Sequence, residues 1–279
     1  MKFNLQNSSG TSYEAYAYTG GKSFDAQQPT VVFIHGVLHD HSVWILQTRY
    51  LAHHGFNVLA VDLPGHCKSG GEAPSSVEEA AQFIAALLDV AGIEKAAIVG
   101  HSWGSLIALE TAAKLKNRIT HLALVGTAFP MKVSPALLEA SLNEPQKALR
   151  MINVFSRATL AAPPSALGPG TWVYGASMAL SRRVLASNAK VNLFHRGFVA
   201  CDSYSNGLAA LSQVTCPILF LLGDNDQMTT PKSAKSLIDQ AKTDGKKFSL
   251  VSVPMGHHQM TESPEETLHA LKAFLTQAG

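Results

Sequence analysis

The residues with the clearest chemical meaning are Gly100-His101-Ser102-Trp103-Gly104. This Gly-x-Ser-x-Gly pattern follows a short apolar run at 96–99 and precedes a helical run at 106–109. A strand, a sharp turn and a helix in this order present such a serine as a nucleophile. The turn strains the serine backbone, so the residues two positions away on each side must be small. Both are glycine, and we therefore predict nucleophilic catalysis by Ser102 rather than a glycine-rich turn without function.

A serine hydroxyl becomes a good nucleophile only when a base removes its proton. The sequence contains twelve histidines, so position must select the base. His257 follows the predicted strand at 248–253 and precedes the last predicted helix. Its loop lies at the carboxyl edge of the sheet, the same edge as Ser102. We predict His257 as the base and expect His258 to be solvent-facing or structural.

The base needs a carboxylate that orients its ring and stabilises its cation. Asp224 and Asp226 both follow the predicted strand at 218–222, at the same sheet edge. Either one gives the chain order Ser, Asp, His that is typical of strand–turn–helix serine nucleophiles. The residues alone leave this choice open, and we expect the other aspartate to be a turn residue.

Negative charge that develops on a substrate carbonyl oxygen needs backbone N–H donors. One donor is expected from Trp103, which follows the nucleophile, and the second from the loop His35-Gly36-Val37-Leu38. Gly36 allows close approach of the backbone. We predict Val37 as the second donor, in preference to Leu38.

Apolar runs interspersed with helical patterns predict the elements that position these groups. Continuous apolar strands indicate burial on both faces, and hence a mostly parallel, doubly wound sheet of the α/β class. The predicted buried strands lie at 31–34, 58–61, 96–99, 122–125, 218–222 and 248–251, and two edge strands at 2–6 and 13–18. Between 129 and 208 the pattern is helical without a strong strand. We predict a core formed by 1–128 and 209–279, with 129–208 inserted as a helical cap.

Composition excludes several classes of protein. The chain has 279 residues, of which 46% are hydrophobic and 15% charged, and its net charge is +2. This balance is typical of a globular enzyme and favours neither nucleic acid nor a membrane as partner. Its three widely spaced cysteines form no disulfide framework or zinc motif. With no secretory signal visible, we expect a cytoplasmic protein.

Other polar clusters have simpler interpretations. His39-Asp40-His41 resembles a set of metal ligands, but a catalytic zinc needs three convergent ligands and the sequence shows no third. We expect no metal and no cofactor. The segment 129–208 has eight Lys or Arg and three Asp or Glu. We interpret these as solvated helix faces, with a carboxylate-bearing substrate or an acidic acyl carrier as the alternative. The arginines concerned are Arg150, Arg157, Arg182, Arg183 and Arg196.

Together the motifs closely resemble the α/β-hydrolase superfamily over nearly the whole chain. The matching residues are His35-Gly36, Asp62-Leu63-Pro64-Gly65-His66, Gly100–Gly104, Gly223-x-x-Asp226-x-x-x-x-Pro231, and Gly256-His257 with Glu262 and Pro264. The resemblance implies an eight-stranded sheet with a cap over Ser102, and its Gly-x-x-Asp spacing selects Asp226 as the acid. One departure is Cys67, where many relatives have glycine.

We therefore predict a carboxylic-ester hydrolase that acts on a small-molecule ester. We expect Met228, Phe129 and Leu38 to contact the substrate. Several alternatives share the triad: a carbon–carbon bond hydrolase acting on a diketone-type substrate, a lactonase, and a cofactor-free haloperoxidase. A non-catalytic ligand receptor on the same fold is the alternative from outside enzymology. Substrate identity depends on the cap, whose helices cannot be oriented from one sequence.

Overall fold

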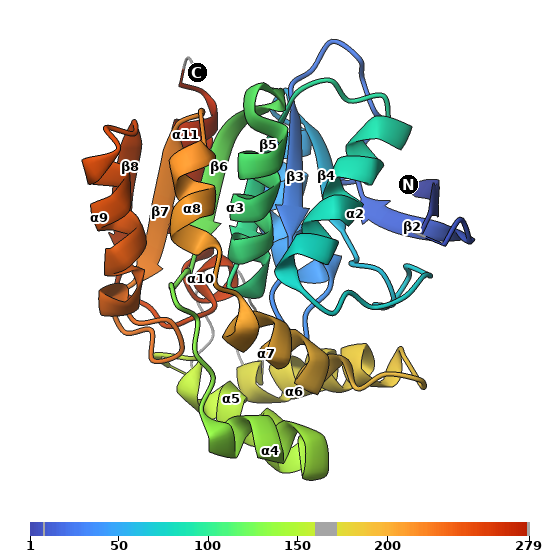
Figure 1. Cartoon of the computed structure of the whole chain (residues 1–279), viewed down its shortest axis with the longest axis vertical. Coiled ribbons are helices and arrows are strands. Elements are labelled where there is room, and N and C mark those ends of the chain that lie inside the picture. Colours follow the sequence, from blue (N-terminus) through green and yellow to red (C-terminus); the bar gives the residue numbers. More distant parts are fainter. Residues whose placement is uncertain (8, 160–171, 278–279) are drawn as a thin grey trace.

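One mixed sheet forms the centre of the molecule (Figure 1). The computed structural model describes residues 1–7, 9–159 and 172–277, and within them eight strands lie in the order β1-β2-β4-β3-β5-β6-β7-β8. β1 and β2 are antiparallel to their neighbours, and the other strands are parallel. The strands are β1 (Lys2–Gln6), β2 (Ser12–Tyr18), β3 (Thr30–Ile34), β4 (Asn57–Val61), β5 (Ala96–His101), β6 (Ile119–Val125), β7 (Ile218–Gly223) and β8 (Phe248–Val253). The predicted fold class is confirmed.

Helices cover both faces of the sheet, as continuous apolar strands require. Alternate strand residues pack to opposite sides: Val32 and Ile34 lie in one apolar cluster, and Val31 and Phe33 in the other. Helices α2, α3, α8 and α9 cover the first face, and α1 and α11 the second (Figure 1). Their bounds are α1 (Ile45–Ala52), α2 (Val77–Val90), α3 (Trp103–Leu115), α8 (Gly207–Gln213), α9 (Lys235–Thr243) and α11 (Pro264–Leu275), with short helices η1 (His41–Trp44), η2 (Lys116–Arg118), η3 (Pro231–Ala234) and α10 (Gln259–Glu262).

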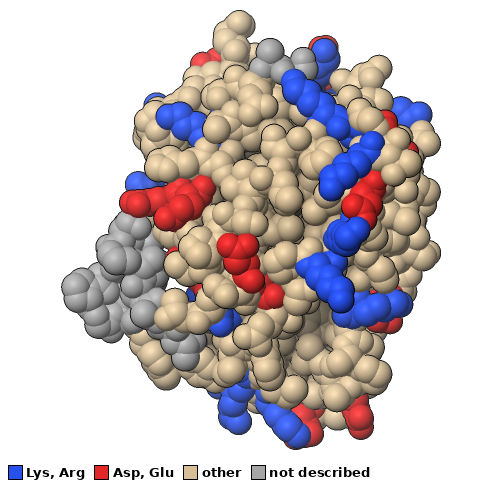
Figure 2. Space-filling view, turned by 90° about the vertical axis from the view of Figure 1, so that its left-hand side faces the viewer, with Lys and Arg blue, Asp and Glu red and all other residues tan. Residues whose placement is uncertain are grey.

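The last strand differs from the others. β8 has a neighbour on one side only, and Leu250 is 51% exposed, so the burial predicted from its apolar residues is incomplete. Figure 2 views the molecule from the side where β8 lies in Figure 1. Lys and Arg side chains gather along one margin of this face, and much of its middle is uncharged.

Of the described helices between β6 and β7, four lie at the end of the sheet where the parallel strands finish (Figure 1). They are α4 (Pro135–Asn143), α5 (Pro145–Phe155), α6 (Val173–Ala186) and α7 (Leu193–Ser203). Their inner side chains form a third apolar cluster with Leu38, which includes Leu149, Phe194 and Phe198. The predicted cap boundary at residue 208 falls inside α8, which packs on α3 and α9 instead. In the described part of the chain, no helix is long and apolar enough to cross a membrane.

Candidate active site

Ser102 lies between β5 and α3 in a strained turn. Its backbone angles are φ 53° and ψ −121°, a left-handed conformation that is rare for a residue with a side chain. The Ser102 amide donates to the carbonyl of Val125 at 2.9 Å, which anchors the turn on β6. Strain of this kind costs on the order of 1–3 kcal/mol and persists only where the surroundings impose it.

The flanking glycines are required by close backbone contacts. A Cβ atom on Gly100 would lie 2.0 Å from the carbonyl oxygen of Gly104, and one on Gly104 would lie 2.5 Å from the carbonyl oxygen of Ile34. Both distances are far inside van der Waals contact. The tight packing between the turn, α3 and β3 therefore explains the pattern from which Ser102 was predicted.

His257 and Asp226 form a buried pair. The Nδ1 atom of His257 lies 2.8 Å from Oδ2 of Asp226, and the two side chains are 7% and 0% exposed. The Thr229 hydroxyl lies 2.8 Å from the same carboxylate oxygen, and the Met228 and Thr229 amides donate to the other. Asp224 is exposed, and so the structure brings Asp226 rather than Asp224 to the histidine.

The surroundings keep Asp226 ionised. Burial by itself raises the pKa of this carboxyl, but the neighbouring His257 and the hydrogen bonds from Thr229 outweigh burial, and the net pKa lies below the ordinary value. A neutral imidazole whose Nδ1–H is directed to this anion has its Nε2 lone pair free, which is the tautomer that a general base needs.

The loop 35–38 reaches the turn that carries Ser102. A Cβ atom on Gly36 would lie 3.2 Å from Cβ of Ser102, so only glycine allows this approach without a shift. Val37, the next residue, lines the cavity at Ser102. Trp103 begins α3, where backbone N–H groups carry partial positive charge. The two predicted oxyanion donors thus lie on the two segments that meet at the nucleophile.

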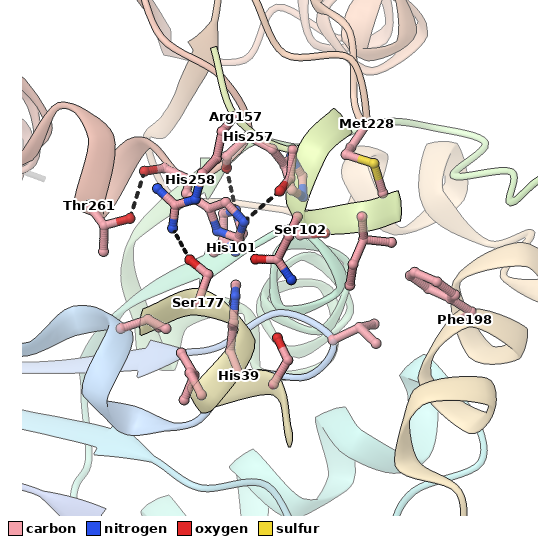
Figure 3. Close-up of a pocket in the computed structure, with 17 residues that line it drawn as sticks. His39, His101, Ser102, Arg157, Ser177, Phe198, Met228, His257, His258 and Thr261 are labelled. Carbon is pink, nitrogen blue, oxygen red and sulfur yellow. Dashed lines mark hydrogen bonds between the residues drawn. The ribbon is translucent and has the colours of Figure 1, made fainter. Parts of the chain in front are cut away.

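Two neighbouring pockets share Ser102 and His257 in their linings, and we call them the small lobe and the large lobe of the site. The small lobe, of about 80 Å³, is shown in Figure 3. The polar side chains that line it include His39, Asn153, Arg157, Ser177, Ser181 and Thr261. The large lobe, of about 320 Å³, is lined by the apolar side chains of Met131, Val133, Leu137, Met151, Phe155 and Cys201 and by the polar side chains of Lys132, Ser134, Gln227 and Thr229. Ile152, Phe198 and Met228 border both lobes.

Comparison with known proteins places this site in a family. Residues 29–264 match the family model for the alpha/beta hydrolase fold. The chain belongs to this family. The resemblance seen in its motifs is confirmed, and the site lies at the carboxyl edge of the sheet, where open α/β sheets bind ligands.

Individual relatives match over part of the chain. The chain is similar to the dihydrolipoyllysine-residue acetyltransferase component of the acetoin cleaving system from Cupriavidus necator, at 38% identity over 40% of this chain and 28% of that protein. It is also similar to lipase LipV from Mycobacterium tuberculosis, at 35% identity over 35% of this chain and 37% of the lipase. The two matches thus cover only 28% and 37% of the relatives' own lengths.

A likeness in fold extends over the whole chain. An esterase (EaEST) from Exiguobacterium antarcticum superposes with a TM-score of 0.79 at 18% identity, covering 99% of this chain and all of the esterase. At this identity the likeness shows the α/β-hydrolase fold and no more.

Two residues expected to contact substrate lie elsewhere in this α/β-hydrolase fold. Leu38 is 1% exposed and packs in the apolar cluster of α4–α7, and lines neither lobe. Phe129 packs its ring against Gly207 and Tyr204, and it too lines neither lobe. Met228 borders both lobes, as its place two residues after Asp226 predicted.

Three further histidines surround His257, and sequence reasoning gave them no role at the site. His101 Nε2 lies 2.7 Å from the carbonyl oxygen of His257, and His258 Nε2 lies 2.9 Å from the Ser156 hydroxyl. Burial lowers the pKa of His39 to about 3 and the pKa values of His101 and His258 well below the ordinary range. These rings are therefore neutral, and they support His257 without adding charge.

The motif at 39–41 is divided between two places. His39 lines the small lobe, whereas Asp40 and His41 turn away and meet Asp62, a third group that spacing did not reveal. The carboxylates are already engaged: Asp40 accepts from Ser42 and Arg183, and Asp62 lies 2.7 Å from His41 Nδ1. These contacts explain the cluster as a junction between η1 and the loop that follows β4.

Proposed function

We propose that this chain is a serine hydrolase that cleaves small carboxylic esters through an acyl-enzyme on Ser102. The observation that carries the proposal is the strained serine that shares both lobes with His257, whose ring is held by Asp226 at 2.8 Å. The similarity to lipase LipV, named above, agrees with this class of reaction.

In this mechanism Ser102 Oγ attacks the carbonyl carbon of the ester while His257 Nε2 takes the hydroxyl proton. The carbonyl oxygen becomes an oxyanion that accepts hydrogen bonds from the Val37 and Trp103 amides. The bond to the alcohol oxygen then breaks, and His257 returns the proton to that oxygen. Water repeats the sequence on the acyl-enzyme and releases the acid. Asp226 stabilises the imidazolium in both halves.

The test compares Ser102 with Ser105, a buried serine in the first turn of α3. Ser102→Ala removes the nucleophile, and we expect kcat for p-nitrophenyl butyrate to fall about ten-thousand-fold or more. Ser105→Ala is the matched control, because Ser105 donates to the Ser102 carbonyl and lines neither lobe. We expect this control to retain most of the activity. Circular dichroism checks that both variants fold, and full activity in Ser102→Ala would overturn the proposal.

A further inference from the structure

The five arginines between residues 129 and 208 lie in different surroundings. Arg150 and Arg182 are exposed. Arg183 forms an ion pair at the η1 junction, and Arg196 donates to a backbone carbonyl at 2.8 Å. Arg157 alone of the five lines the cavity at the nucleophile. The structure thus separates one arginine from a group that the sequence could only treat together.

The Arg157 guanidinium has an incomplete set of partners. Its Nη2 donates to the Ser177 hydroxyl at 2.5 Å, as Figure 3 shows, while its buried Nε has no acceptor in the described part of the chain. Burial lowers the pKa of the Arg157 guanidinium below its ordinary value, and the nearby carboxylate of Glu262 offsets this lowering only in part. Yet no Asp or Glu of the described residues lies within 4.0 Å of Arg157, and the sequence from 160 to 171 contains neither.

Glu262 is engaged elsewhere. Its two oxygens accept hydrogen bonds from the backbone amides of Ala158 at 2.9 Å and His258 at 3.0 Å, and the carboxylate fixes the loop that carries His257. It therefore acts on Arg157 over a distance and supplies no direct hydrogen bond. The histidines beside Arg157 are neutral, so among the described residues that line the small lobe Arg157 is the one permanent charge.

Arg157 is half-buried, and its Nε atom is fully enclosed. A cation withdrawn from water without a direct counter-ion is costly, and a bidentate contact with a carboxylate relieves that cost. The small lobe also offers the hydroxyl of Ser181 as a donor, whereas the Thr261 hydroxyl already donates to the His258 carbonyl at 3.3 Å. Its volume of about 80 Å³ exceeds the roughly 10–15 Å³ that one water molecule needs. It therefore has room for a small group of several heavy atoms.

We propose that the small lobe binds a carboxylate of the substrate through Arg157, so the preferred substrates are esters that carry a free carboxylate. This inference rests on the proposed ester hydrolysis and names its substrate class. The rest of the ester lies across Ser102, with an apolar portion in the large lobe. The carboxylate belongs either to the acyl part or to the alcohol part, and the experiment distinguishes the two.

The test uses matched pairs of esters that differ in one group. Monobutyl glutarate is compared with its carboxamide analogue, and butyryloxyacetate with butyryloxyacetamide, so each pair exchanges a carboxylate for a neutral group of the same shape. We expect kcat/KM to be about 10- to 100-fold higher for the carboxylate in one pair. That pair shows which side of the ester enters the small lobe. Equal values within both pairs would overturn the inference.

Three variants assign the preference to its residue. Arg157→Met is expected to remove the ratio of carboxylate to carboxamide turnover, and Arg157→Lys to retain part of it, because lysine keeps the charge but not the planar pair of donors. Arg150→Met removes the same charge from an exposed position of α5 and is expected to leave the ratio unchanged. A ratio that falls equally in Arg150→Met and Arg157→Met would show general attraction to a basic surface instead. Thermal unfolding shows whether Arg157→Met folds, and the lysine variant keeps the test valid if it does not.

A binding measurement separates this inference from the proposed reaction. Calorimetry measures the dissociation constant of glutarate for the Ser102→Ala protein, with and without Arg157→Met or Arg157→Lys. If no ester is hydrolysed but glutarate binds about 10-fold more weakly without the arginine, the subsite stands and the reaction fails. If esters are hydrolysed but glutarate binding is independent of residue 157, the reaction stands and the subsite fails.

Discussion

The two lobes that meet at Ser102 differ in size and in the groups that line them. The small lobe holds Arg157, buried histidines and hydroxyls, whereas the large lobe is lined mainly by methionine, leucine, valine and phenylalanine side chains, with Lys132 as its one Lys or Arg among the described residues. Their boundary contains the predicted nucleophile and base, which come from loops at the sheet edge. The loops at the sheet edge thus position Ser102 and His257. The helices α4–α7 contribute many of the side chains that make one lobe polar and the other mainly apolar.

A change that acts on the residues shared by both lobes is expected to affect all esters alike. Asp226→Asn leaves His257 without an anion and favours the wrong tautomer, and we expect kcat to fall about ten-thousand-fold for carboxylate and neutral esters equally. Asp224→Asn is the matched control, because Asp224 is exposed in the same turn. Steady-state kinetics on both ester types checks this. A larger loss in the Asp224 variant would move the acid to that residue.

A change in one lobe is expected to affect one ester type. Leu137 lines the large lobe and not the small one. In Leu137→Trp the larger side chain therefore occupies space that the apolar acyl chain of the ester would use. Each methylene buried is worth about 0.8 kcal/mol, or roughly fourfold in kcat/KM. We expect the variant to lose about 10- to 50-fold on octanoate esters and little on acetate esters. Leu142→Trp, at a position 54% exposed on the same helix, should have no such effect. A uniform loss on both esters would show that the large lobe does not select chain length.

The buried histidines of the small lobe predict how stability depends on pH. The pKa of His39 is lowered to about 3 from its model-compound value of 6.5, chiefly by burial. Between these values the unfolded chain binds a proton that the folded protein does not, and so the free energy of unfolding falls as the pH falls. One such group contributes up to about 1.4 kcal/mol per pH unit.

Urea unfolding from pH 7 to pH 4 measures this slope. We expect His39→Gln to flatten it, while His53→Gln, at an exposed position of the loop after α1, leaves it unchanged. Equal slopes in the wild type and His39→Gln would mean that His39 takes up its proton in the folded protein, and the account of a neutral small lobe would be wrong.

Most strands, and the residues at their carboxyl ends, could be predicted because the patterns that reveal them are local in the chain. The glycines around Ser102 reflect contacts within one turn, and apolar runs mark strands buried between helices. The incomplete burial of β8 was missed, since an edge position depends on strand order and not on composition.

The lobes could not be predicted, because they depend on how helices lie over the sheet. Phe129 and Leu38 are close in sequence to functional segments, yet their side chains pack away from both lobes. Arg157 was one of five similar arginines, and only its place just after α5, beside Ser177 of α6 and in the lining of the small lobe, singles it out. His39 was noted as part of a metal-like motif, although its ring lies with His101 and His258.

Covalent labelling tests the central claim most directly. The wild-type protein is treated with a fluorophosphonate, and the adduct is located by intact mass and by peptide mapping, with Ser102→Ala as the control. The account predicts one adduct, on Ser102, formed at a rate that glutarate slows by occupying the small lobe. No adduct, as expected of a ligand receptor, or an adduct on another serine would contradict it.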